Sequence, residues 1–157
     1  MSTSQNKDTK KIYFMKLAFE QATRALGNTK ENPAVGCVIA KKNTLISAGH
    51  TGINGIPHAE QNAIDFSKED VAKSDLYVTL EPCSNYGKTP PCLNTIIEKK
   101  INKVYFSIRD PDIRSYNKSK KKLSKNKIKV KNLLSNSGDL FYKSYIKYKK
   151  KQLPFVT

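Results

Sequence analysis

Four residues that together can bind and use a metal ion lie in two short segments of the chain. His58 and Glu60 are two residues apart, and Cys83 and Cys92 follow further along. Zn²⁺ binds imidazole nitrogen and thiolate sulfur, and a catalytic zinc site keeps a fourth position open for water. One neutral imidazole and two thiolates cancel the charge of the dication, so ionisation of the water becomes the important step. The sequence therefore predicts a zinc hydrolase with His58, Cys83 and Cys92 as ligands and Glu60 as proton carrier.

The spacing of these residues resembles that of a known enzyme class. Histidine-x-glutamate followed by proline-cysteine-x-x-cysteine is the signature of zinc base deaminases, but here eight residues separate the cysteines. This longer loop, with Gly87 and a proline pair, resembles that of the riboflavin-pathway diaminohydroxyphosphoribosylaminopyrimidine deaminases, within the cytidine deaminase-like superfamily. The segments that carry the resemblance are 32–39, 55–60, 77–83, 86–92, 110–111 and 154–156.

The resemblance implies a reaction and a set of substrate contacts. The reaction is zinc-dependent hydrolytic deamination of 2,5-diamino-6-(5-phosphoribosylamino)pyrimidin-4(3H)-one to 5-amino-6-(5-phosphoribosylamino)uracil and ammonia, with Glu60 as catalytic residue. It also implies substrate contacts from Asn32, Thr51, Asn85 and Lys88. Of these, Lys88 matches a family position that meets the phosphate or ribose, whereas Thr51 and Asn85 stand where the family often has histidine.

Two other functions fit part of the pattern. A deaminase acting on tRNA adenosine or a cytosine-type base would use the same catalytic residues, although the long loop between the cysteines argues against it. A non-catalytic module would instead close the zinc site with Cys37 as a fourth ligand, leaving no position for water. Cys37 lies within an apolar run and is expected to be a core residue. His50 is expected to be exposed to solvent and not to bind the metal.

The net charge of +16 is compatible with nucleic-acid binding but does not require it. Only three of the 29 basic residues are arginine, the residue that base and phosphate recognition favour. A lysine-rich composition is also what a compositional bias of the genome produces. The charge would attract a phosphorylated metabolite without identifying it; the resemblance implies a phosphorylated pyrimidine substrate, and a nucleic-acid partner is not expected.

Composition also bounds location and organisation. The chain of 157 residues has no long apolar run, so neither a membrane span nor a signal peptide is expected. Three cysteines in a partial ligand pattern indicate a reducing, cytoplasmic compartment. We expect a polar N-terminal extension over residues 1–11, a deaminase domain over 12–153 and no reductase domain. The resemblance implies a homo-oligomer and a separate reductase protein, unless the sequence is part of a longer chain.

Helices and strands alternate in the pattern that must position these residues. His58 precedes a helix, and Glu60 can share its pocket only from the first turn of that helix. Cys83 follows a strand, and Cys92 begins a helix. Such alternation predicts an α/β fold, a three-layer α/β/α sandwich on a mixed sheet, and the resemblance implies the cytidine deaminase-like version. Helices are expected at 12–26, 59–66, from 92, at 118–125 (or a turn) and at 140–148, and strands at 34–40, 45–48, 75–80, 103–108 and 128–130.

Overall fold

A computed structural model describes residues 2–87, 89–112 and 118–151. Its centre is a five-stranded sheet with the order β2-β1-β3-β4-β5. β1 pairs antiparallel with β2 and β3, whereas β3, β4 and β5 run parallel. The strands are β1 (Gly36–Lys41), β2 (Thr44–His50), β3 (Asp75–Leu80), β4 (Lys103–Ile108) and β5 (Lys129–Asn132). The predicted mixed sheet is confirmed, with β2 and β5 at its two edges.

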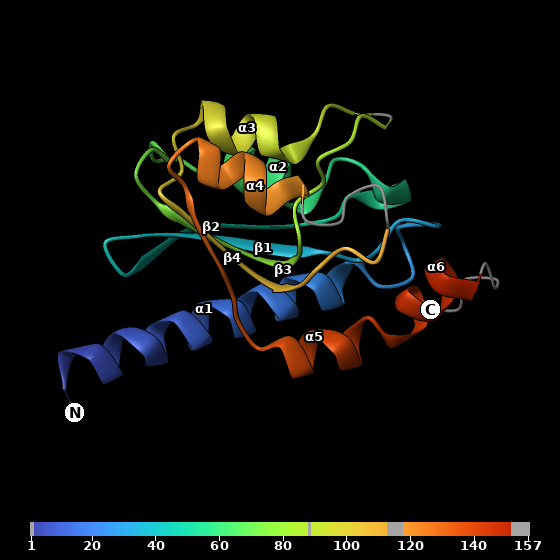
Figure 1. Ribbon diagram of the computed structural model, residues 1–157, viewed down its shortest axis with the longest axis horizontal. Helices are drawn as coiled ribbons and strands as arrows, with labels where there is room; N and C mark the ends of the chain where they lie inside the picture. The colour runs from blue at the N-terminus through green and yellow to red at the C-terminus, as the bar shows by residue number, and fades with distance from the viewer. Residues whose placement is uncertain (1, 88, 113–117, 152–157) are drawn as a thin grey trace.

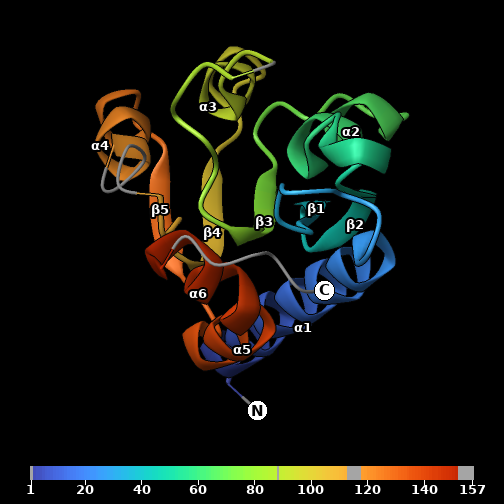
Figure 2. The ribbon, with the colours of Figure 1, turned by 90° about the vertical axis from the view of Figure 1, so that its right-hand side faces the viewer.

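Helices cover both faces of this sheet. Figure 1 shows α2 (Ala59–Phe66), α3 (Cys92–Glu98) and α4 (Lys118–Lys125) on one face, with α1 (Thr3–Ala25) and α5 (Ser135–Phe141) on the other. A short 3-10 helix, η1 (Ile53–Gly55), precedes α2, and α6 (Lys143–Lys151) follows α5. Viewed from the side in Figure 2, the three layers are separate, as the sequence predicted.

The central strands form the core because both of their faces are covered. Along β1, Cys37 and Ile39 contact the α2 side, and Val38 and Ala40 contact the α1 side, as the two-residue period of a strand requires. Gly36 permits the closest approach, since a Cβ atom there would lie 1.8 Å from the carbonyl oxygen of Ala18 in α1. The sheet therefore fixes where each strand ends and where the following loop begins.

Two predicted boundaries were wrong. The first helix, predicted to start at residue 12, already begins at Thr3 and includes residues 3–11. Its start is stabilised by a capping box, in which the side chain of Ser2 accepts from the Gln5 backbone N–H and the Gln5 side chain accepts from the Ser2 N–H. The single last helix predicted for 140–148 is two helices, α5 and α6, with Tyr142 between them. β1 and β2 form an antiparallel hairpin that turns at Lys42 and Asn43.

Candidate metal centre and active site

The starts of two helices and the end of one strand bring the predicted ligands together. His58 is the N-cap residue of α2, which places Glu60 in the first turn of that helix. Cys83 follows the C-terminal end of β3, and Cys92 is the first residue of α3. The helix starts present free N–H groups and a positive dipole end, which favour thiolates and other anions.

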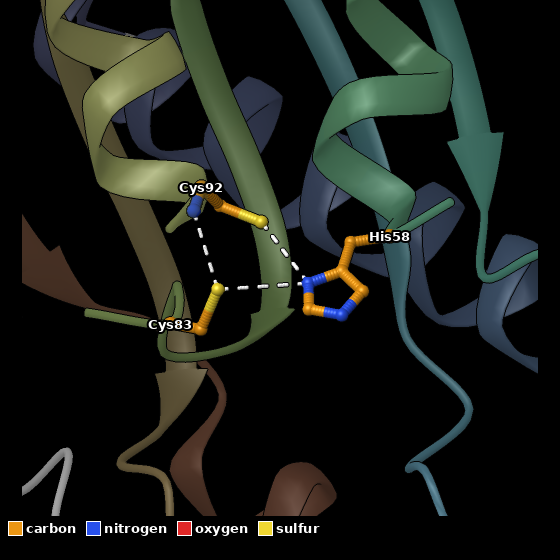
Figure 3. A group of neighbouring side chains, drawn as sticks. All are labelled: His58, Cys83 and Cys92. Atoms are coloured by element: carbon orange, nitrogen blue, oxygen red, sulfur yellow. Dashed lines mark hydrogen bonds between the residues drawn. The ribbon is translucent and has the colours of Figure 1, made fainter. Parts of the chain in front are cut away.

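The three ligand atoms are close enough to share one ion. The Nδ1 atom of His58 lies 3.1 Å from the sulfur of Cys92 and 3.5 Å from the sulfur of Cys83. All three ligand atoms lie within 4.8 Å of one another, and Figure 3 shows the side chains converging from three segments. Tetrahedral zinc with its usual bond lengths separates N and S ligands by roughly 3.5–3.8 Å. The donor set and the 3.5 Å separation from Cys83 therefore fit Zn²⁺, whereas the 3.1 Å separation from Cys92 is shorter than this range.

The electrostatics of this cluster favour a thiolate at Cys83. Hydrogen bonding with Cys92 and His58, including the Cys92 backbone N–H at 3.2 Å, lowers the pKa of Cys83 to about 4. The hydrogen bond with Cys83 also raises the pKa of His58 to about 9. The pKa of Cys92 is raised by the neighbouring Cys83 and by burial. In the protein without metal, Cys83 therefore ionises before Cys92.

Glu60 is placed to exchange protons beside the ligands. Its side chain is only 4% exposed, and its Oε2 lies 3.6 Å from the sulfur of Cys92. Burial raises the pKa of Glu60 to about 6. A carboxyl group with a pKa near neutrality can both accept and return a proton, which is the property that general acid–base catalysis needs.

A cavity of about 200 Å³ opens beside His58, Glu60 and Cys83. Three of the four predicted substrate contacts, Asn32, Thr51 and Asn85, line it. Thr51 is 3% exposed and its hydroxyl accepts from the Val35 backbone N–H at 2.9 Å, so it also holds the cavity wall. Lys88 lies outside the described residues.

Further residues line the cavity, none of them predicted as site residues. They include Glu81, Asp110, Asp112, Tyr145 and Lys149. Burial raises the pKa of both Glu81 and Asp110, although each accepts a hydrogen bond from a backbone N–H. The position of Glu81 and Asp110 just after strands was a usable signal. Tyr145 and Lys149 lie on α6, and no local sequence pattern marked them as cavity residues.

Cys37 and His50 lie apart from the metal ligands. The fully buried Cys37 lies in the core of β1 as predicted, and it is not part of the His58–Cys83–Cys92 group among the described residues. His50 is half-buried, so the expectation of an exposed side chain was wrong. Its Nδ1 lies 3.1 Å from the Thr51 carbonyl oxygen.

The chain matches the cytidine and deoxycytidylate deaminase zinc-binding region over residues 8–108. It is 39% identical over 144 residues to the diaminohydroxyphosphoribosylamino-pyrimidine deaminase of Buchnera aphidicola, covering 91% of this chain and 98% of that protein. It is 38% identical over 146 residues to the riboflavin biosynthesis protein RibD of Bacillus amyloliquefaciens. That match covers 92% of this chain but only 39% of the longer relative.

Solved structures of similar proteins share the fold of this chain. The Thermotoga maritima diaminohydroxyphosphoribosylaminopyrimidine deaminase/5-amino-6-(5-phosphoribosylamino)uracil reductase aligns with a TM-score of 0.86 at 37% identity. The alignment covers 92% of this chain and 42% of that one. Acinetobacter baumannii RibD aligns with a TM-score of 0.87 at 34% identity, over 93% of this chain and 42% of its own.

Proposed function

Since the chain belongs to the zinc-binding cytidine and deoxycytidylate deaminase family, we propose that it is the diaminohydroxyphosphoribosylaminopyrimidine deaminase of riboflavin biosynthesis. This zinc hydrolase acts on a cyclic amidine, converting 2,5-diamino-6-(5-phosphoribosylamino)pyrimidin-4(3H)-one to 5-amino-6-(5-phosphoribosylamino)uracil and ammonia. The observation that carries the proposal is the buried carboxyl group of Glu60 beside a three-ligand group, at the wall of a cavity.

Each residue has a role in the proposed reaction. His58, Cys83 and Cys92 would hold Zn²⁺, which when bound lowers the pKa of a water to about 7. Glu60 takes one proton of the attacking water and transfers it to a ring nitrogen; it then takes the proton of the hydroxyl group added to the carbon and gives it to the amino group, which leaves as ammonia when its C–N bond breaks. One carboxyl group can perform these steps because acid and base roles interchange as the reaction proceeds.

Substrate binding is assigned to the cavity wall. Asn32 and Asn85 present amide groups that can pair with the polar edge of the pyrimidine. Thr51 shapes the wall through its bond with the Val35 N–H. Lys88 stays a predicted contact to the phosphate or ribose.

The two other functions make different demands on the site. A structural zinc site needs a fourth protein ligand, and the buried side chain of Cys37 is not within the ligand group found in the described part of the chain. A tRNA deaminase remains the rival for the same catalytic residues, and substrate turnover separates it from our proposal.

The test is ammonia release by the purified protein and its Glu60→Gln variant. The wild-type protein should deaminate the pyrimidine intermediate and not an adenosine stem-loop RNA. Glu60→Gln should keep one zinc per chain while losing about 100-fold to 10,000-fold in kcat. Glu98→Gln, an exposed change on α3, serves as the matched control. Turnover of the RNA alone, or full activity of Glu60→Gln, would refute the assignment.

The wider setting is also part of the proposal. Among the described residues, no helix is both long and apolar enough to cross a membrane. The three cysteines are free thiols, which supports the predicted cytoplasmic location. Self-association and a separate reductase protein stay predictions.

A further inference from the structure

A lysine side chain that is not among the proposed catalytic residues lies at the rim of the cavity. Lys149, on α6, is the only lysine or arginine among the described residues that line the cavity. Four carboxyl groups line the same space, from Glu60, Glu81, Asp110 and Asp112. A ligand with a negative charge therefore needs Lys149 to offset repulsion by these carboxyl groups.

The ammonium group of Lys149 is held at the rim without being committed to one short hydrogen bond. Its Nζ lies 3.8 Å from Oδ2 of Asp112, whereas a strong charge-assisted bond spans about 2.7–2.9 Å. The side chain of Lys149 is 30% exposed, and that of Asp112 is 15% exposed. The ammonium also lies 5.8 Å from the ring centre of Tyr145 and 5.9 Å from that of Tyr148. Cation–π attraction to these rings keeps the ammonium near the cavity mouth.

Two of the cavity carboxyl groups already accept hydrogen bonds from the backbone. An oxygen of Glu81 accepts from the Asp110 N–H at 3.0 Å, and an oxygen of Asp110 accepts from the Asp112 N–H at 2.9 Å. These bonds fix the carboxyl groups in the wall. An ammonium group has three donors, so Lys149 can keep its pairing with Asp112 while donating to a further anion.

We propose that Lys149 binds the phosphate group of the substrate, with the pyrimidine ring at the Glu60 end of the cavity and the phosphate at the α6 end. This assignment rests on the proposed function. It makes α6 part of the substrate site and adds a second phosphate contact to the one predicted for Lys88. A phosphate monoester carries about −1.5 to −2 charges at neutral pH, and the ammonium group of Lys149 can offset part of this charge.

The test compares the phosphorylated pyrimidine substrate with its dephosphorylated ribosyl form. Lys149→Gln should raise the KM for the phosphorylated compound by about tenfold or more, with kcat changed less than about twofold. The KM for the dephosphorylated compound should stay the same, because that compound has no group for the ammonium to bind. Lys147→Gln, an exposed change on the same helix, should alter neither KM.

A binding measurement makes the result independent of turnover. Calorimetric titration with 5-amino-6-(5-phosphoribosylamino)uracil should show the same tenfold weakening in Lys149→Gln, and titration with the dephosphorylated product should not. Equal losses for both forms, or no loss for either, would overturn the assignment of Lys149 while leaving the proposed function intact. Failure of the wild-type protein to release ammonia from either form would overturn both.

Discussion

Replacing Tyr142 by phenylalanine should destabilise the protein, although this change removes only one oxygen atom. The hydroxyl of Tyr142 is buried and donates to the Ala34 carbonyl oxygen at 2.7 Å. The same hydroxyl pairs with the hydroxyl of Thr79, which in turn accepts from the Gly36 backbone N–H at 3.1 Å. Since Tyr142 donates to Ala34, Thr79 must donate to Tyr142. The chain of bonds therefore links the α5–α6 junction to β1 and β3.

The size of the effect follows from which groups lose a partner. Tyr142→Phe leaves the Ala34 carbonyl and the Thr79 hydroxyl hydrogen without the phenol oxygen, in a place where water does not reach. An unsatisfied buried polar group costs about 1–3 kcal/mol. We expect the free energy of unfolding to fall by about 2 kcal/mol or more, and Tm to fall by at least about 4 °C for a chain of this length.

Urea unfolding followed by circular dichroism would measure this change. Tyr13→Phe is the matched control, because Tyr13 is 52% exposed on α1. Burial also raises the pKa of Tyr142, so the folded state keeps a proton that the unfolded state releases above about pH 10. The contribution of the Tyr142 hydroxyl to the free energy of unfolding is therefore fully present below about pH 10 and is lost as the pH rises above it. Tyr142→Phe should make the free energy of unfolding fall less steeply with pH in this range. A free energy of unfolding within about 0.5 kcal/mol of the Tyr13→Phe value would refute the hydrogen-bond chain.

Two further changes test the metal ligands and the packing of α1. Cys83→Ser should lose the zinc, measured as metal per chain by mass spectrometry. Cys37→Ser should keep it, because Cys37 lies outside the ligand group. Loss of zinc in both variants would support the four-ligand alternative. Gly36→Ala should unfold at a urea concentration well below wild type, with a loss of about 3 kcal/mol or more, because its Cβ would lie 1.8 Å from a backbone oxygen of α1. Gly87→Ala should unfold close to wild type, because among the described residues other than its chain neighbours no atom lies within 4 Å of the added carbon.

The metal centre could be predicted from the sequence because each of its residues has a local signal. His58 stands directly before a helix that runs over residues 59–66, as predicted, and Cys92 begins the next predicted helix. Cys83 follows a strand whose bounds, 75–80, were also predicted. Zinc chemistry, together with the resemblance to zinc deaminases, favoured one histidine and two thiolates as ligands. The alternative with Cys37 as a fourth ligand stayed open in the sequence, and the structure leaves Cys37 outside the ligand group.

The elements that were wrong depend on contacts that local periodicity does not contain. The first turns of α1 carry few apolar residues, so a hydrophobic pattern could not detect them. Their capping box was visible in Ser2 and Gln5 but is a weaker signal than an apolar stripe. The break at Tyr142 has no proline or glycine to mark it. Tertiary bonds of the Tyr142 hydroxyl, made to residues far away in the sequence, hold that position.

The same break explains why α6 contributes to the cavity. Gly138 lets α5 approach β4 closely, since a Cβ there would lie 2.3 Å from the Ser107 side chain. Tyr142 then anchors the chain to Ala34, next to the cavity wall. Tyr145 and Lys149 lie four residues apart on one face of α6, and the centre of the Tyr145 ring lies 6.3 Å from that of Tyr142. The anchor and the two rim residues therefore form one surface, so a change that releases Tyr142 should also displace Lys149 from the cavity.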